Sequence, residues 1–401
     1  MTHRPPLSPE SRRLVGQTVA AVLVLAAGTI GYLFAAPWIL PLRVAEGPLV
    51  QLVTPTSAAV VWFTSRPAGC TFELTAEGAR PAVTVESRGR RHVARLTGLT
   101  PDTAYAYAIH SGRRLAGDTL RSGKTAEQPI RFVVFGDSGK GKPEQFHLVP
   151  LMREAAPDFL VHTGDVVYPD GARRRYSARF FAPYRTLLSR VALWPSLGNH
   201  DVDDGGAAGP YLDVFELLAN GPAGTTPGHH YWFDQGPARF AVVDSNVSGA
   251  ELRERVGPWL RDVLGDATPR WRFVVMHHPP YSTGRYRPSP DILTALVPVF
   301  EEVGVDVVFA GHDHNYQRSH ALRDGAVVAP NEGVHYVISG AGGARLYELH
   351  EPRSALFAAA HDRQHGFTVV ELAGDVLHLK HIVRDGTTVD EWVLDRAAVP
   401  D

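Results

Sequence analysis

Cysteine is almost absent from this sequence of 401 residues. Cys70 is the single cysteine, so the chain can form no internal disulfide and no cluster of thiolates that would hold zinc or an iron–sulfur centre. Any metal must therefore be held by His, Asp, Asn or Tyr, which are harder ligands. An excess of positive charge is also missing, because 40 Lys and Arg face 42 Asp and Glu, for a net charge of -2. We therefore expect no nucleic-acid partner.

The N-terminal region contains a long run without charge, residues 14–36, LVGQTVAAVLVLAAGTIGYLFAA. At 1.5 Å per residue, a helix of this length exceeds the roughly 30 Å hydrocarbon core of a bilayer. Three arginines, offset by Glu10, lie in residues 1–13, which predicts a cytoplasmic tail, a single-pass anchor in the cell membrane and an extracytoplasmic remainder. The alternative is a cleaved signal peptide and a secreted protein, but such peptides have an apolar region of about 7–15 residues.

Residues 37–47 are expected to form a Pro-containing linker. Residues 48–125 then consist of short alternating runs, such as AAVVWFTS and AYAYAIH, bounded by Gly, Pro, Ser or Thr. This pattern predicts a small all-β sandwich. The segment LTGLTPDTAYAYAI places Tyr105 and Tyr107 on one face of a strand and resembles the fibronectin type III pattern, in which one tyrosine hydroxyl bonds back to the preceding loop. We interpret this domain as a spacer or packing module.

Residues 126–396 alternate apolar runs with amphipathic stretches, as in IRFVVFGD followed by EQFHLVPLMREAA. Buried strands alternating with helices predict an α/β domain whose sheet is covered on both faces. Open α/β sheets bind ligands at the carboxyl ends of their strands, and five of these runs end in residues that can bind metals. The residues are Asp137 in FGDSG, Asp165 and Tyr168 in TGDVVY, Asn199 and His200 in GNHD, His277 in VVMHHP, and His312 and His314 in GHDH.

Each of these clusters alone has an ordinary structural explanation, as a turn, a helix cap or a surface histidine. Taken together they offer two carboxylates, an amide oxygen, three imidazoles and a phenol, which is enough for two adjacent sites if one carboxylate bridges. Two metals about 3.5–4 Å apart can hold a hydroxide and stabilise both ends of an in-line displacement at phosphorus. The set therefore indicates a binuclear metal site for phosphate-ester chemistry.

The order GDSG, GDVVY, GNHD, VVMH and GHDH resembles the motifs of the calcineurin-like metallophosphoesterases, and more narrowly those of the purple acid phosphatases, over roughly Pro48 to Leu394. The resemblance implies a β-sandwich flanked by helices (αββα) and a phosphoric ester hydrolase with two metal ions. The tyrosine three residues after the bridging aspartate is the discriminating feature, because it binds ferric iron in the purple enzymes. The implied Fe³⁺ ligands are Asp137, Asp165, Tyr168 and His314; the implied ligands of a divalent ion (Fe²⁺, Zn²⁺ or Mn²⁺) are Asp165, Asn199, His277 and His312, with Asp165 bridging.

Two further residues are assigned to catalysis. His200 is not needed as a ligand, and its place beside Asn199 predicts a general acid or a transition-state stabiliser. We expect Asp201 to orient the His200 imidazole, as carboxylates do for other imidazoles. The VxxH motif can also be read as Val275 to His278, but the resemblance favours His277.

The chain departs from the plant-type purple enzymes after VxxH, where PPYSTGRYRP stands in place of additional histidines. Tyr281, Arg285 and Arg287 are candidates for contacting phosphate or the leaving group, and an exposed loop is the equal alternative. The run Arg173 to Arg175 is interpreted as a solvated helix face rather than a phosphate-steering patch. Four other histidines are interpreted as structural, namely His229, His230, His361 and His365.

These observations predict an extracytoplasmic acid phosphatase that hydrolyses small-molecule phosphomonoesters by in-line attack of metal-bound hydroxide. One alternative is a phosphodiesterase acting on nucleotides or phospholipid headgroups, because the same metal centre serves both reactions. Another is a catalytically inactive surface-binding protein, which would be expected to have lost at least one ligand. The sequence retains all of the expected ligands.

Overall fold

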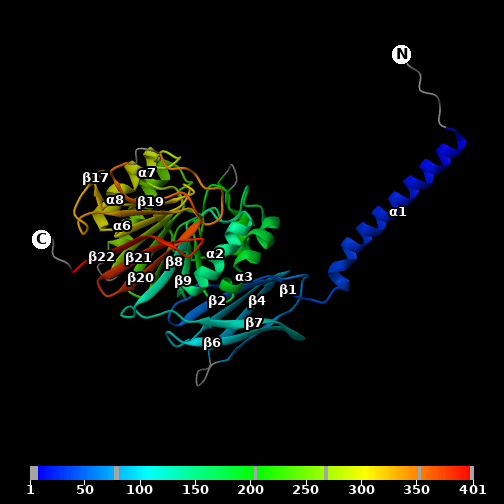
Figure 1. The fold of residues 1–401 in the computed structure, drawn as a ribbon. Coiled ribbons are helices and arrows are strands. Elements are labelled where there is room, and N and C mark those ends of the chain that lie inside the picture. Colours follow the sequence, from blue (N-terminus) through cyan, green and yellow to red (C-terminus); the bar gives the residue numbers. More distant parts are fainter. Residues whose placement is uncertain (1–7, 76–80, 203–205, 266–269, 351–353, 398–401) are drawn as a thin grey trace, which may run out of the picture.

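The computed structural model describes residues 8–75, 81–202, 206–265, 270–350 and 354–397, and within the first helix the side chains of residues 11–12, 14–16 and 30–39 also lie outside the description. Helix α1 (Pro9–Ile39) projects away from the rest of the chain in Figure 1. The predicted anchor, residues 14–36, falls on this helix. Among the described residues no helix is both long and apolar enough to cross a membrane.

The N-terminal β domain contains two antiparallel sheets, ordered β1-β2-β5-β4 and β3-β6-β7. Its first strand begins at Val44, within the predicted linker. The strand order is that of a seven-stranded immunoglobulin-like sandwich of the constant type. The strands are β1 (Val44–Gln51), β2 (Ser57–Thr64), β3 (Thr71–Thr75), β4 (Ala82–Arg88), β5 (Arg91–Thr97), β6 (Ala104–Ser111) and β7 (Arg113–Arg121).

The two tyrosines of β6 point inward, as the alternation of the sequence predicts. The hydroxyl of Tyr105 accepts a hydrogen bond of 2.7 Å from the backbone N–H of Thr100, which confirms the predicted bond to the preceding loop. The hydroxyl of Tyr107 donates instead to the carbonyl of Ser189, in the next domain, at 2.7 Å. A small all-β sandwich is therefore present, whereas its assignment as fibronectin type III is not confirmed.

The second domain contains two stacked sheets (Figure 1). One has the order β10-β9-β8-β20-β21-β22 and the other β11-β12-β13-β14-β18-β15-β19. The strands of the first sheet are β8 (Ile130–Phe135), β9 (Phe159–His162), β10 (Ala192–Pro195), β20 (Gly366–Ala373), β21 (Val376–Val383) and β22 (Thr388–Asp395). Those of the second are β11 (Tyr231–Gln235), β12 (Ala238–Val243), β13 (Trp271–Met276), β14 (Val307–Ala310), β15 (Tyr316–Ser319), β18 (His335–Ser339) and β19 (Phe357–His361), with a separate pair, β16 (Leu322–Arg323) and β17 (Ala326–Val327).

Period-two alternation explains why the sheets stack. In β8, Phe132 and Val134 face the second sheet, where they join a core that includes Phe240 and Phe273. Val133 and its neighbour Phe135 face the other way, toward α2 and α3. Helices α6 and α8 cover the outer face of the second sheet. The predicted α/β sandwich with helices on both outer faces is thus confirmed. The helical elements are α2 (Pro143–Glu154), η1 (Arg173–Arg175), η2 (Ser177–Phe181), α3 (Ala182–Leu188), α4 (Gly209–Val214), α5 (Gly249–Glu251), η3 (Leu252–Val256), α6 (Gly257–Leu264), α7 (Pro290–Ala295) and α8 (Val297–Val303).

The two domains contact each other through ion pairs. Glu216 accepts from Arg91 at 2.6 Å and from Arg95 at 2.7 Å. Arg173 pairs with Glu46 and with Asp213, each at 2.6 Å. The interpretation of the Arg173 to Arg175 run as a solvated face is therefore wrong for its first residue, because Arg173 is half-buried between the domains. Local sequence did not show this, since both of its partners lie far away in the chain.

Candidate metal centre

The five predicted clusters meet at one edge of the two-sheet sandwich. In the first sheet β8, β9 and β10 run parallel, and in the second β13 and β14 do the same. The carboxyl ends of parallel strands lie at the same edge of a sheet. The structure brings all seven predicted ligands together, and they are Asp137, Asp165, Tyr168, Asn199, His277, His312 and His314.

One half of the cluster contains the tyrosine. The hydroxyl of Tyr168 lies 3.1 Å from Oδ1 of Asp137 and 3.0 Å from Nε2 of His314. The same Nε2 lies 3.4 Å from Oδ1 of Asp137. These three side chains, buried and in mutual contact, are ones that the family resemblance assigns to the ferric ion.

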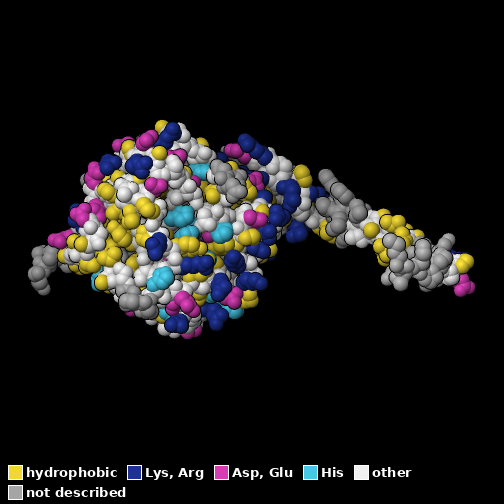
Figure 2. All heavy atoms as spheres, turned by 90° about the horizontal axis from the view of Figure 1, so that it is seen from above, with side chains coloured by type: hydrophobic (Ala, Val, Ile, Leu, Met, Phe, Trp, Pro, Cys, Tyr) yellow, Lys and Arg dark blue, Asp and Glu magenta, His cyan; other side chains and the backbone are white. Residues whose placement is uncertain are grey.

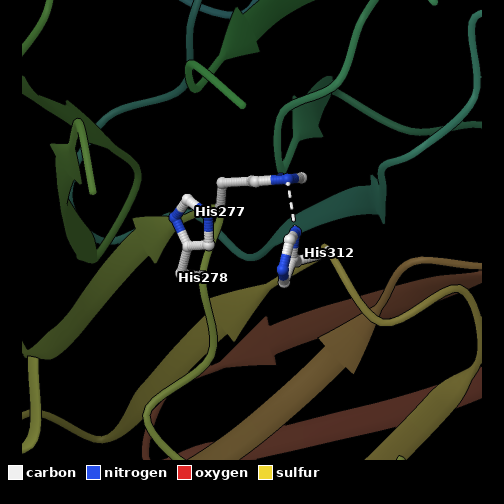
Figure 3. A group of neighbouring side chains, drawn as sticks. All are labelled: His277, His278 and His312. Atoms are coloured by element: carbon white, nitrogen blue, oxygen red, sulfur yellow. Dashed lines mark hydrogen bonds between the residues drawn. The ribbon is translucent and has the colours of Figure 1, made fainter. Parts of the chain in front are cut away.

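The other half contains the amide. Oδ1 of Asn199 lies 3.0 Å from Nε2 of His277 and 3.0 Å from Nδ1 of His312. Those two nitrogens are 3.3 Å apart and are joined by the dashed line in Figure 3. The two rings follow β13 and β14 and meet edge to face, with planes at 74°. Oδ1 of Asp165 is 3.5 Å from Nε2 of His277. Ligand atoms of Asp137, Asp165 and His277 all lie within 4.8 Å of one another, so Asp165 lies between the two halves.

Backbone carbonyls fix which histidine nitrogens face the centre. Nδ1 of His277 pairs with the carbonyl of Thr163 at 2.9 Å, and Nδ1 of His314 pairs with the carbonyl of Arg345 at 2.7 Å. A carbonyl only accepts hydrogen bonds, so each Nδ1 carries a proton. Burial lowers the pKa of His277 well below its usual value, so the Nε2 of this residue keeps a lone pair. The Nε2 lone pair of His277 then faces the oxygens of Asn199 and Asp165. Acceptors this close to one another are suited to hold a cation between them.

The electrostatics lead to the same conclusion. Burial, together with the charges of Asp137 and Asp165, raises the pKa of the Tyr168 phenol well above its usual range. Burial, reinforced by the Asp165 charge, raises the pKa of Asp137 to about 6. Burial keeps His277 neutral by lowering its pKa well below the usual value. Bound cations reverse such shifts for carboxyl and phenol groups, so the donor set fits metal ions of the kind implied.

Strained backbone accompanies the ligands. Asp137, Asp165 and His312 have positive φ angles of 54°, 56° and 67°, which are uncommon for residues other than glycine. Such strain is concentrated at functional sites. The adjoining glycines allow close approach, since a Cβ at Gly311 would lie 2.4 Å from Oδ2 of Asp137.

The structure separates the two predicted catalytic residues. Nδ1 of His200 bonds to the carbonyl of Pro169 at 2.5 Å, and Nε2 lies 4.0 Å from Oδ2 of Asp165, beside the cluster. The prediction that Asp201 orients His200 is wrong. The buried Asp201 carboxylate instead accepts hydrogen bonds from the backbone N–H groups of Val166 and Gly198 at 3.0 Å and of Val167 at 3.3 Å. It joins the loop that bears Asp165 to the loop that bears Asn199.

Several contacts near the ligands were not predicted. The ring of Tyr286 lies 4.0 Å from that of His312, and Tyr347 stacks on His314 at 4.0 Å. Nζ of Lys140 lies 3.9 Å from the ring centre of Tyr168. His278 offers a third nitrogen within 4.8 Å of those of His277 and His312 (Figure 3), while its Nδ1 bonds to Ser245. Only an unusual GDSGKGK segment could have indicated Lys140; the tyrosines carry no local signal.

The remaining candidates lie in ordinary structural contacts. Tyr281 packs against Tyr336, and Arg287 is exposed. The histidines interpreted as structural have partners of that kind. His229 bonds to Asp244, His230 to the backbone of the same residue, His361 to the backbone of Gln364 and His365 to the carbonyl of Ala344.

Comparison with known proteins identifies the domain that holds this centre. Residues 130–316 match the family described as calcineurin-like phosphoesterase. The matched residues include all seven candidate ligands. Histidine side chains gather near the middle of the face of the molecule shown in Figure 2.

The relatives of the phosphoesterase domain include purple acid phosphatases. The chain is 29% identical over 272 residues to an uncharacterized protein of Mycobacterium tuberculosis, covering 57% of this chain and 51% of that protein. It is 26% identical to purple acid phosphatase 15 of Arabidopsis thaliana, covering 63% and 54%. The chain thus spans about half the length of these relatives. The purple acid phosphatase PPD1 of yellow lupin has the same fold, with a TM-score of 0.74 at 19% identity, covering 87% and 74%. These findings support a phosphoric ester hydrolase.

Proposed function

We propose that this chain is a phosphomonoesterase that uses two metal ions. The observation that carries the proposal is the close approach of seven donor groups from five strand ends, with three imidazoles directed at carboxylate and amide oxygens. One ion would be held by Asp137, Asp165, Tyr168 and His314, and the other by Asp165, Asn199, His277 and His312. Such ions supply Lewis-acid polarisation of the phosphoryl group and a reactive water at moderate pH.

The protein groups around the ions would position the substrate. Nε2 of His200 is directed beside Asp165, because Nδ1 is occupied by the carbonyl of Pro169. It is therefore available to exchange a proton with the ester oxygen that leaves. The bonds from Asp201 to three backbone N–H groups hold the ligand loops in register, so that Asp165 and Asn199 stay fixed through the reaction.

Phosphodiester hydrolysis and a binding role without catalysis are the alternatives to test. The proposal is tested with the full chain, loaded with iron and with a second divalent metal in separate preparations. Metal content, the visible spectrum and the hydrolysis of phenyl phosphate and bis(4-nitrophenyl) phosphate are measured on each. We expect two metals per chain, turnover of the monoester, and a visible tyrosinate–iron band in the iron-loaded protein.

The test of the iron ligand is Tyr168→Phe, with Tyr176→Phe as the matched control. Both tyrosines are buried, and among the described residues the hydroxyl of Tyr176 has no hydrogen-bond partner. We expect the visible band to vanish in the first variant and to persist in the second. A colourless, active wild type would retain the phosphoesterase and remove iron. Metal binding without turnover of either ester would overturn the enzymatic proposal in favour of a binding protein.

The extracytoplasmic location also belongs to the proposal. It is supported by the sequence pattern of residues 1–36. Cell fractionation with protease accessibility of the phosphoesterase domain in intact cells tests it, and protection of that domain would overturn it.

A further inference from the structure

The loop of residues 282–287 is attached directly to the loop that bears two of the proposed ligands. Asp313 lies between His312 and His314 in sequence and is fully buried. Its Oδ1 accepts the backbone N–H of Arg285 at 2.9 Å and that of Tyr286 at 3.4 Å. Its Oδ2 accepts the hydroxyl of Ser282. Hydrogen bonds to Asp313 therefore fix this loop beside the segment that carries His312 and His314.

Two side chains of this loop and Tyr347, from a later segment, pack beside the centre. Tyr347 lies against the His314 ring, with ring centres 4.0 Å apart and planes at 13°. The guanidinium of Arg285 lies on the ring of Tyr347, 4.6 Å from its centre, and 5.7 Å from that of Tyr286. His314, Tyr347 and Arg285 thus form a column. Cation–π contacts of this kind hold a guanidinium in place without neutralising its charge.

Among the described residues, no carboxylate pairs with this cation. Within the described part of the chain, the guanidinium of Arg285 has no ion pair, although the side chain is exposed at the edge of the centre. Figure 2 shows Lys and Arg side chains beside the histidines on the face where these gather. A planar guanidinium with free donors suits bidentate binding of a carboxylate or a phosphate.

The column also shows where the anion would lie. Arg285 contacts the ring of Tyr347, and Tyr347 in turn contacts the His314 imidazole. A group that contacts the guanidinium therefore lies away from the phosphoryl position, on the alcohol portion of the ester. We propose that Arg285 binds an anionic group there, so that the enzyme prefers phosphomonoesters whose leaving group carries a second negative charge. This inference rests on the proposed phosphatase activity.

The test uses two substrates that differ in one charge. They are 4-carboxyphenyl phosphate and 4-carbamoylphenyl phosphate, which have nearly the same shape. For the wild type and for Arg285→Gln, kcat/KM is measured on both substrates. We expect the substitution to lower kcat/KM for the carboxylate substrate by about five- to tenfold, as for a partly exposed charge contact, and to leave the amide substrate within about twofold. 1,4-Phenylene bisphosphate, run in parallel, shows whether a second phosphate is preferred to a carboxylate.

The matched controls are Arg287→Gln and Arg285→Lys. Arg287 is an exposed arginine two residues away. Arg287→Gln removes the same charge from the same loop, and we expect it to leave the ratio of the two kcat/KM values unchanged. Lysine keeps the charge but loses the planar stack and the fork, and we expect a ratio between those of the wild type and Arg285→Gln. An equal loss on both substrates would place Arg285 at the transferred phosphoryl group and overturn the proposal. An unchanged ratio would also overturn it.

A binding measurement separates this inference from the proposed function. The non-hydrolysable (4-carboxybenzyl)phosphonate and (4-carbamoylbenzyl)phosphonate are titrated into wild type and Arg285→Gln by calorimetry. If the protein binds the charged phosphonate more tightly only while Arg285 is present, the inference holds even where no ester is hydrolysed. If both proteins show the same ratio of the two affinities, the inference fails while the phosphatase proposal can still hold.

Discussion

Gly198 lies where any side chain would collide with Asp165, and Gly198→Ala therefore tests the placement of the proposed bridging carboxylate. A Cβ added there would lie 2.2 Å from the backbone nitrogen of Asp165 and 2.2 Å from its Oδ1. Ordinary contact begins at 3.4 Å, so the two loops must separate by about 1 Å, and a backbone atom cannot rotate away. Ligand sets tolerate displacements of only about 0.5 Å, and an error of about 1 Å can cost on the order of 100-fold in rate.

We expect Gly198→Ala to lower kcat/KM on phenyl phosphate by roughly 100-fold and to reduce the metal content below two ions per chain. Elemental analysis and steady-state rates measure these effects, and circular dichroism checks the fold. Gly209→Ala is the matched control, because no atom of the described residues lies within 4 Å of its added Cβ and Gly209 is the first residue of helix α4. Alanine favours a helix by about 0.5–1 kcal/mol over glycine, so this variant should keep full activity and wild-type or slightly higher stability.

The reasoning would be refuted by a Gly198→Ala protein that binds two metals and turns over within about twofold of the wild type, a margin far inside the effect expected from a 1 Å shift. If Gly198→Ala does not fold, Gly311→Ala makes the same test on the other side of the centre. Its Cβ would lie 2.4 Å from Oδ2 of Asp137. Loss of metal in that variant, with the fold retained, would support the same ligand set.

Three further predictions follow from single contacts. Asp201→Ala leaves three buried backbone N–H groups without their acceptor. At about 1–3 kcal/mol per group, we expect urea denaturation to show a decrease of several kcal/mol in the free energy of unfolding. An unchanged free energy of unfolding would return Asp201 to the role of orienting His200. Glu216→Gln removes the charge shared by Arg91 and Arg95 between the domains, which should cost about 1–2 kcal/mol at low salt and less at high salt, and a cost independent of salt would contradict the ion-pair account. Burial lowers the pKa of His381 to about 3, so on acidification the unfolded chain takes up a proton at this residue before the folded chain does. The contribution of His381 to the free energy of unfolding is therefore fully present above about pH 6.5. Below that pH it falls by up to about 1.4 kcal/mol per pH unit toward pH 3. His381→Phe, which can keep the stack on Tyr316, should lose less stability between pH 7 and pH 4, and equal losses in the two proteins would show that other groups dominate.

The sequence was informative wherever a local pattern determines a geometry. The apolar run IRFVVF was predicted to be a buried strand, and in the structure it places Phe132 and Val134 on one face and Val133 on the other. Apolar runs that end in glycine and a metal-binding side chain identified strand ends, and parallel strands bring such ends to one edge whatever the details of the loops. This is why seven candidate ligands could be predicted to lie together while their distances could not.

Partners that depend on loop paths were beyond such reasoning. Asp201 sits next to His200 in sequence, and adjacency suggested that it orients the imidazole. In the structure its carboxylate turns toward Val166, Val167 and Gly198, because those N–H groups face inward where two loops cross. Arg173 was misjudged for a similar reason, since its acceptors Glu46 and Asp213 come from distant parts of the chain.

The GHDH motif shows how the two kinds of information combine. Its histidines could be predicted as ligands from sequence, whereas Asp313 between them has the appearance of a spacer. The carboxylate of Asp313 is buried and accepts from Ser282, Arg285 and Tyr286. An unpaired buried carboxylate would be costly, so this residue both needs and fixes the loop that carries Arg285. The same four-residue motif therefore carries two of the proposed metal ligands and places the side chain that we expect to select the substrate.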